Sequence, residues 1–273
     1  HRLSLRLEPE DALACDNQRF AVVSAGPSPR ILLVGDESAS EVPYLLRAMI
    51  APSVQPAVHH RFVLDVKPPE QWETGLQLAP FVVILADLPR VTGPQWRAAE
   101  AFVRAGGSLL LVPGPHVSTA GDAGAALLPA PILGIEALDP PLRLAATDLK
   151  HPYLRPFDAQ DVDSINTPHA YRRLRVGPLL AGSRVLVPFA DGQPGLLERS
   201  ISGGRVLLLT FSPERDWGQF GTQAAPFLVL LQTVLGELAP RPQGTGSYAA
   251  GQSVAFPLGQ SGISELFQTG GAT

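Results

Sequence analysis

Short, uninterrupted runs of aliphatic residues recur along this chain, and segments with helical spacing of apolar residues separate them. A strand with one solvent-facing side alternates apolar and polar residues, whereas a strand covered on both sides is apolar throughout. Continuous runs interleaved with helices therefore indicate an α/β fold with a mostly parallel sheet and helices on both faces. The runs interpreted as buried strands are Ile31–Val34, Phe62–Val66, Phe81–Leu85, Ser108–Val112 and Val206–Leu209.

The helices are expected at three places along this pattern. Proline is well tolerated in the first turn of a helix, and glycine commonly ends one. The expected helices cover about Glu41–Ile50, the segment from Pro94 to Gly106, and about Ala224–Leu238. The middle segment, about Ser118 to Gly182, is less regular. After it, two further strands, Arg184–Phe189 and Gly195–Ser200, are predicted around a turn at Asp191-Gly192.

Composition divides the chain into three parts. Residues 1–27 contain an alternating strand pattern, Leu3–Leu7, and a second apolar run, Phe20–Val23. Two such strands cannot bury themselves, so we expect them to end a preceding β-domain, followed by a linker. Residues 28–240 form the α/β domain, and residues 241–273 read as a linker and the start of a further β segment at Val254–Phe256.

Charge and cysteine content exclude some classes of function. The formal net charge is -4, from 21 basic and 25 acidic residues, so the concentrated basic face that nucleic-acid binding requires is not expected. The single cysteine, Cys15, excludes an internal disulfide and any site with several cysteine ligands. The most apolar stretch, Phe227–Leu238, is too short for a membrane span, which needs roughly 20 residues. Any membrane anchor is therefore expected outside this chain.

Ligands of open α/β sheets bind at the carboxyl ends of the strands, so the residues there are the candidate site. The loop after the first strand, Gly35-Asp36-Glu37-Ser38, lacks the glycine patterns of dinucleotide and phosphate loops. Asp36 and Ser38 are instead expected to cap the following helix. The crevice residues that we single out are Asp36, Gly114, His116 and Asp216.

The end of the fourth strand is where we expect the sharp turn that holds the nucleophile in amidotransferase-like folds. Such a turn needs a cysteine or serine at its tip, and Pro113 to His116 supply neither. His116 could act as a base, but a base without a nucleophile supports no acyl transfer. A histidine satisfied by its neighbours is the plainer interpretation.

The remaining candidates for chemistry are isolated. Cys15 is expected to be a small buried apolar residue rather than a nucleophile. His59 and His60 are adjacent, so in a strand they point to opposite faces and do not share one ion. His151 and His169 lie in irregular sequence without acidic residues at ligand spacing. We therefore predict no metal and no cofactor.

The order of several motifs resembles that of a known family. These motifs are Asp11–Asn17 followed by Phe20–Val23, Arg30–Asp36, His151-Pro152, and Gly204–Asp216 leading into the last helix. Over residues 3–240 the chain resembles the glutamine-amidotransferase-like (class I) region of bacterial membrane proteins that carry BatA-type and von Willebrand factor A domains. The resemblance implies a flavodoxin-like, amidotransferase-like fold without the nucleophile, and an Ig-like domain ending within residues 1–27. It also implies a membrane anchor outside this chain and an extracytoplasmic (periplasmic) location.

These observations lead to three hypotheses of function. The first is a non-catalytic interaction or scaffold domain whose partners are envelope proteins or other domains of the same chain. The second is a hydrolase or amidotransferase-like enzyme that uses His116, Asp36 or Asp216 in an unrecognised site. The third is a sensor that binds a small ligand in the same crevice without chemistry. A pocket that joins these side chains would favour the second hypothesis.

Overall fold

The computed structural model describes residues 2–6, 18–22, 28–50, 62–88, 90–117, 124, 126–157 and 165–240. The chain divides into two units, one of which is Pro27–Pro240 and the other His1–Gly26 with Arg241–Thr273. In the latter unit the described part is an antiparallel pair of strands, β1 (Arg2–Arg6) and β2 (Gln18–Val22). Cys15, His59, His60 and the expected strand Val254–Phe256 lie outside the described residues.

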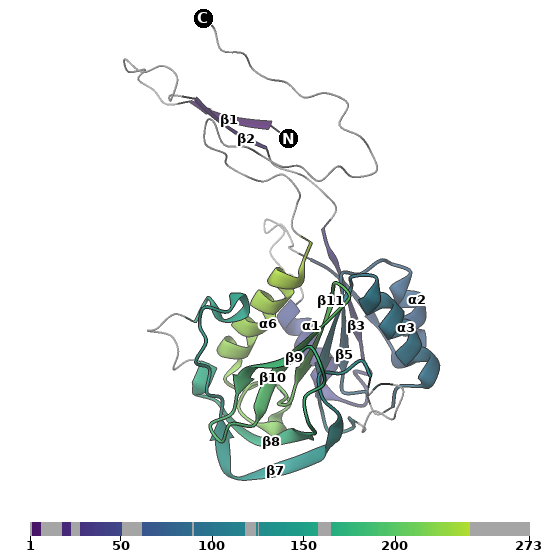
Figure 1. Cartoon of the computed structure of the whole chain (residues 1–273), viewed down its shortest axis with the longest axis vertical. Helices are drawn as coiled ribbons and strands as arrows, with labels where there is room; N and C mark the ends of the chain where they lie inside the picture. The colour runs from purple at the N-terminus through teal and green to yellow at the C-terminus, as the bar shows by residue number, and fades with distance from the viewer. Residues whose placement is uncertain are drawn as a thin grey trace, which may run out of the picture. The chain divides into compact units, whose positions relative to one another are not determined.

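A seven-stranded sheet forms the centre of the unit Pro27–Pro240. The strand order is β4-β3-β5-β6-β11-β10-β9, in which the first five strands are parallel and β10 runs antiparallel to both of its neighbours, β11 and β9 (Figure 1). The predicted mostly parallel α/β sheet is therefore confirmed. The strands are β3 (Arg30–Val34), β4 (Val63–Lys67), β5 (Val82–Ala86), β6 (Ser108–Val112), β9 (Ser183–Pro188), β10 (Pro194–Ile201) and β11 (Gly204–Leu209).

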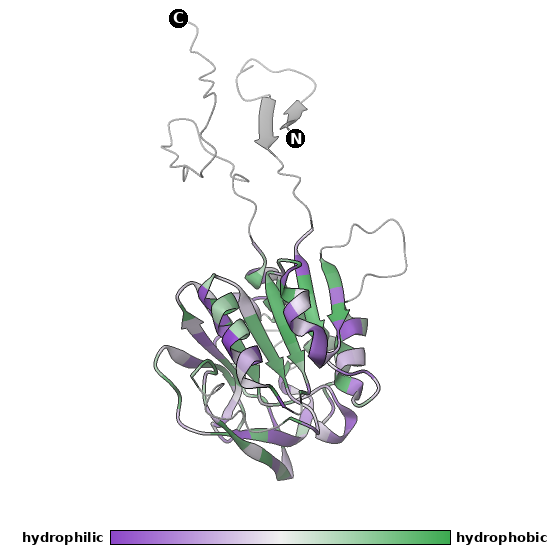
Figure 2. Ribbon diagram, turned by 90° about the vertical axis from the view of Figure 1, so that its right-hand side faces the viewer, coloured by the Kyte–Doolittle hydropathy of each residue, from purple (hydrophilic) through white to green (hydrophobic). Residues whose placement is uncertain are grey.

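Helices cover both faces of the sheet, which explains why its inner strands are apolar throughout (Figures 1 and 2). Alternate side chains of β3 serve the two faces: Ile31 packs in one core cluster, whereas Leu32 packs in the other. α1 and α6 contribute to the first cluster, and α2 and α3 contribute to the second. These helices are α1 (Glu41–Ile50), α2 (Trp72–Leu76), which follows the 3-10 turn η1 (Pro69–Gln71), α3 (Gly93–Arg104) and α6 (Ala224–Leu238).

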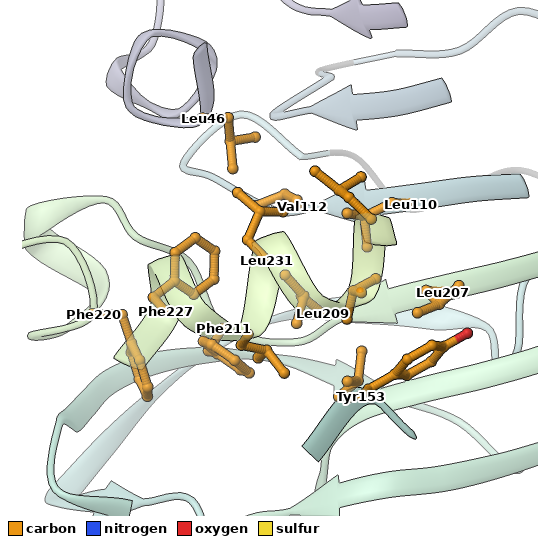
Figure 3. Close-up of a cluster of buried hydrophobic side chains, with 14 of the residues drawn as sticks. Leu46, Leu110, Val112, Tyr153, Leu207, Leu209, Phe211, Phe220, Phe227 and Leu231 are labelled. Atoms are coloured by element: carbon orange, nitrogen blue, oxygen red, sulfur yellow. The ribbon is translucent and has the colours of Figure 1, made fainter. Parts of the chain in front are cut away.

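Aromatic side chains fill the core beneath α6 (Figure 3). The Phe211 ring lies 4.4 Å from the Phe220 ring and 6.1 Å from the Phe227 ring, measured between centroids. Each fully buried side chain of this size contributes about 1.5–3 kcal/mol relative to an exposed one. The predicted helix over about Ala224–Leu238 is thus a core helix that faces the sheet.

The middle segment, for which the sequence predicts little regular structure, forms a second antiparallel pair of strands. The long strand β7 (Ile132–Arg143) pairs with β8 (His169–Val176), with shifts of register on either side of Gly134–Ala137. Gly134 and the prolines Pro140 and Pro141 interrupt the alternation within β7, so its pattern in the sequence is weak. Two 3-10 turns, η2 (Pro152–Leu154) and η3 (Arg215–Trp217), lie in the connections.

Candidate functional site

At the carboxyl edge of the parallel strands, the loops after β5 and β6 are joined by one pair of side chains. Asp87 follows β5 directly, and His116 lies four residues beyond the end of β6. His116 Nδ1 lies 2.9 Å from Asp87 Oδ2, and the His116 backbone N–H donates to Asp87 Oδ1 at 2.8 Å. Both carboxylate oxygens of Asp87 therefore bind one residue of the neighbouring loop.

The backbone at Asp87 makes this contact possible. Asp87 has φ 47°, in the left-handed region, where aspartate is better tolerated than most residues. Of the described residues, it is the non-glycine residue with positive φ that directly follows a parallel strand. The chain therefore turns sharply directly after β5.

Gly114 is fitted tightly against Asp87. A Cβ atom at Gly114 would lie 2.3 Å from Asp87 Cγ and 2.7 Å from Asp87 Cβ, too close for any side chain. A turn from Gly114 to Val117, closed by a 3.3 Å backbone hydrogen bond, then brings the His116 amide over the carboxylate. The absence of a side chain at Gly114 thus lets the two loops approach each other.

The two members of the pair differ in exposure. The Asp87 side chain is fully buried, whereas 47% of the His116 side chain is exposed. Within the described residues His116 Nε2 has no hydrogen-bond partner. An imidazole held at Nδ1 by a carboxylate and open at Nε2 can accept a proton from water, which is general-base geometry.

Asp36 does not reach this pair in the described structure. Its Oδ1 atom accepts the Ser38 backbone N–H at 2.9 Å and the Ser38 hydroxyl at 2.6 Å. The hydrogen bonds from Ser38 hold the pKa of the exposed Asp36 carboxyl below its usual value. Ser40, rather than Asp36 or Ser38, caps α1, because its Oγ accepts the Val42 N–H at 3.2 Å. The expected capping residues were therefore wrong by two or more positions.

Asp216 lies exposed in η3, beyond the end of β11. The carboxyl whose pKa is shifted in this segment is that of Glu214. Burial raises the pKa of Glu214, and the nearby carboxylates of Asp216 and Glu41 raise it further. One carboxyl oxygen of Glu214, Oε2, is buried and has no hydrogen-bond partner among the described residues. In the described part of the chain, neither carboxyl is hydrogen-bonded to His116.

The open hollow at this edge is separate from the Asp87–His116 pair. It lies before α1 and is lined by Glu37, Ser38, Ala39, Ser40, Glu41 and Tyr44. Since Asp36, His116 and Asp216 are not among its lining residues, this hollow is not a pocket that joins them. Of the predicted crevice residues, the structure brings Gly114 and His116 together and adds Asp87, which sequence reasoning missed.

The two described histidines of the middle segment take part in different hydrogen-bond sets. His151 Nδ1 accepts the Tyr153 N–H at 3.3 Å, whereas His169 Nε2 accepts from Arg143 Nε at 3.0 Å. His169 Nδ1 also lies 3.2 Å from Gln219 Oε1. Among the described residues, no group of three or more histidine, cysteine, aspartate or glutamate side chains is placed to hold a metal ion.

Comparison with known proteins gives a likeness in fold. The chain matches no protein-family model and no curated protein in sequence. It is similar to a cytoplasmic protein of Salmonella typhimurium LT2, with 14% identity and a TM-score of 0.60 over 77% of this chain and 100% of that one. A second cytoplasmic protein of Salmonella typhimurium gives 12% identity and a TM-score of 0.57 over 78% and 100%. A ThuA-like protein from Bacteroides uniformis gives 13% identity and a TM-score of 0.57 over 80% and 94%.

These likenesses bear out the amidotransferase-like fold class. They contradict the expected extracytoplasmic, membrane-anchored location, because both Salmonella structures are described as cytoplasmic proteins. The described residues also contain no helix that is both long enough and apolar enough to cross a membrane. The resemblance to BatA-type and von Willebrand factor A proteins is named by none of these comparisons and stays a prediction.

Proposed function

We propose that this domain is a non-catalytic interaction module with an amidotransferase-like fold. The observation that carries the proposal is that Asp87, at the sharp turn after β5, uses both carboxylate oxygens to hold the His116 loop. The buried carboxylate of Asp87 fixes one loop to the next. The predicted nucleophile position, Pro113 to His116, contains neither cysteine nor serine.

The serine hydroxyls at this edge support the proposal. Ser38 donates to Asp36, Ser40 caps α1, and the buried Ser212 accepts the Glu214 backbone N–H at 3.2 Å. Within the described residues none of them is hydrogen-bonded to His116. Acyl transfer needs a nucleophile within hydrogen-bond reach of its base, and these hydroxyls have structural roles instead.

Exposed apolar side chains on the β7–β8 pair are the surface that we propose for a protein partner. Leu133, Ile135 and Tyr171 are 49%, 40% and 38% exposed. Aromatic and aliphatic residues of this kind form the buried centres of protein interfaces. The partner is another domain of the same chain or a separate protein.

A pair of variants tests the proposed surface. Ile135→Glu places a charge on β7, and Leu228→Glu places the same charge on α6, where Leu228 is 37% exposed. We expect a protein that crosslinks to the wild-type domain to be lost with Ile135→Glu and retained with Leu228→Glu. Retention with both variants would contradict the assignment of the surface to the β7–β8 pair.

A second candidate function is hydrolysis in which His116 activates a water molecule. The half-exposed His116 ring, held at Nδ1 by a buried carboxylate, is the observation that favours it. One assay separates the two candidates: turnover of a panel of ester, phosphoester and glycoside substrates by wild type and His116→Ala. The interaction module shows no turnover that depends on His116, whereas turnover abolished by His116→Ala establishes the hydrolase.

A further inference from the structure

A second polar cluster lies on the other side of the domain core from α3, where η2 packs beside α6 and the strands β9, β10 and β11. Its centre is Glu198, whose side chain is 3% exposed. Glu198 accepts the Tyr153 hydroxyl at 3.0 Å and Arg184 Nε at 2.8 Å, and Arg205 donates to the Tyr153 oxygen at 2.9 Å. The His151 cluster is therefore His151, Tyr153, Arg184, Glu198 and Arg205.

His151 is the member of this cluster whose contacts conflict with its chemistry. The Tyr153 backbone N–H points at Nδ1 from 3.3 Å, and Arg184 Nη2 lies 3.1 Å from Nε2. Both neighbours are donors, whereas a neutral imidazole has one accepting nitrogen. Neutral His151 can therefore satisfy one of the two donors, and protonated His151 can satisfy neither.

The net effect of burial and of the charges around His151 also favours the neutral ring. Burial lowers the pKa of His151, and the Arg184 guanidinium on β9 lowers it further. Arg205 on β11 also opposes the imidazolium, while Glu198 on β10 and Asp148 in the preceding loop favour it. The contact with the Tyr153 amide is consequently that of the uncharged ring with no proton on Nδ1.

We propose that His151 is an acid-sensitive latch: at neutral pH its Nδ1 atom accepts the Tyr153 N–H and holds the start of η2, and in mild acid a proton on Nδ1 releases this contact. Protonation replaces an acceptor by a donor at the helix cap and places a second cation beside Arg184. The Tyr153 side chain, anchored on Glu198, keeps the rest of the turn in place. The release is thus local, at residues His151 to Leu154.

The sign of the pH dependence follows from linkage. Because the pKa of His151 is lower in the latched state than in the released state, the released state binds the proton more tightly. The latch is complete above the ordinary histidine pKa of about 6.5 and weakens as the pH falls through the lowered pKa.

Amide hydrogen exchange of the full chain at pH 7.5 and pH 5.5, expressed as protection factors, tests the latch. We expect protection of the Tyr153 amide to fall by about tenfold in acid, the loss of one ordinary hydrogen bond, while amides of β5 and β6 keep theirs. In His151→Asn, whose side chain can still cap η2 but does not titrate, protection should be independent of pH. Tyr153→Phe, which keeps the histidine, should show the same loss in acid as wild type.

Two results would overturn the latch. The first is equal protection of the wild-type Tyr153 amide at both pH values. The second is an acid-induced loss that persists in His151→Asn, because another group would then be responsible. General destabilisation by either variant lowers protection at both pH values and leaves this comparison intact.

Discussion

Asp87 and Gly114 form the junction between the ends of β5 and β6, and each of the two loops depends on a feature of the other. The carboxylate needs a neighbour without a side chain, and the loop after β6 needs an acceptor for the His116 amide. Because the carboxylate is fully buried, no solvent replaces a hydrogen bond that is lost here. Substitutions at this junction should therefore lower the free energy of unfolding by more than the change in side-chain volume alone suggests.

Asp87→Asn is expected to lower the free energy of unfolding by about 1–3 kcal/mol, because an amide can accept at one oxygen only. Asparagine tolerates the left-handed backbone, so the effect reports the hydrogen bonds to His116. The measurement is urea denaturation followed by circular dichroism. Asp36→Asn, at an exposed carboxyl, is the matched control and should change stability much less than Asp87→Asn. Equal effects of the two variants would show that the Asp87 contacts contribute nothing specific.

Gly114→Ala is expected to destabilise the domain by about 1–3 kcal/mol through overpacking against Asp87. Gly93→Ala places the same methyl group in the first turn of α3, where the nearest atom, Arg97 Nη1, is 3.8 Å away. Since alanine favours helices, that control should be neutral or stabilising by up to about 1 kcal/mol. Thermal unfolding of both variants checks the contrast, and a neutral Gly114→Ala would contradict the tight junction.

The sequence analysis singled out Gly114 and His116 as crevice residues but not their partner, Asp87. Strand ends could be recognised from the apolar runs, so the loops after β5 and β6 were both known to be candidates. Which of their side chains meet depends on the register Ala86 to Val112 and on the φ of Asp87. Neither quantity leaves a pattern in the local sequence, and an aspartate after a strand has several ordinary roles.

The turn η2 shows how a short element can be held by polar contacts from three strands. Tyr153 is buried at 1% exposure, and its hydroxyl bridges Glu198 of β10 and Arg205 of β11. Burial, followed by the Glu198 carboxylate, raises the pKa of Tyr153 to about 12. The hydroxyl therefore keeps its proton where an exposed tyrosine loses it.

Tyr153→Phe is expected to lower stability by about 1–2 kcal/mol at pH 8, because Glu198 and Arg205 each lose one partner. The folded pKa of Tyr153 is higher than its unfolded value, so this contribution is complete below about pH 10 and is lost as the pH rises toward 12. The difference in urea midpoint between wild type and Tyr153→Phe should thus shrink above pH 10. Tyr171→Phe, at a tyrosine that is 38% exposed, should show no such trend.

Elements with a strong local pattern were predicted well, and those that depend on distant partners were not. Hydrophobic spacing and turn residues predicted the strands β3, β4, β5, β6 and β11, the pair β9–β10, and the helices α1, α3 and α6. β7 and β8 were missed because half of each strand faces solvent, and because arginines occupy three of the eight β8 positions. Arg173, for example, reads as exposed but is buried beside Glu136, Asp191 and the Phe189 ring.

On the scale of the whole molecule, the unit Pro27–Pro240 contains two core clusters, one on each face of the same sheet. A fragment of residues 27–240 is expected to unfold in one cooperative transition, because both clusters share the strands β3, β5, β6 and β11. Two separate transitions by fluorescence and circular dichroism would contradict a single cooperative unit.

The order in which the strands are made differs from the order in which they pair. β6 is followed in the sequence by β7, β8, β9 and β10, yet its outer neighbour in the sheet is β11. On the ribosome, β3 to β6 therefore emerge long before β11, and the apolar edge at Leu109–Val112 has no partner strand in that interval. An unpaired apolar edge readily associates with other chains. Until β11 emerges, the outer edge of β6 is thus open to association with other chains.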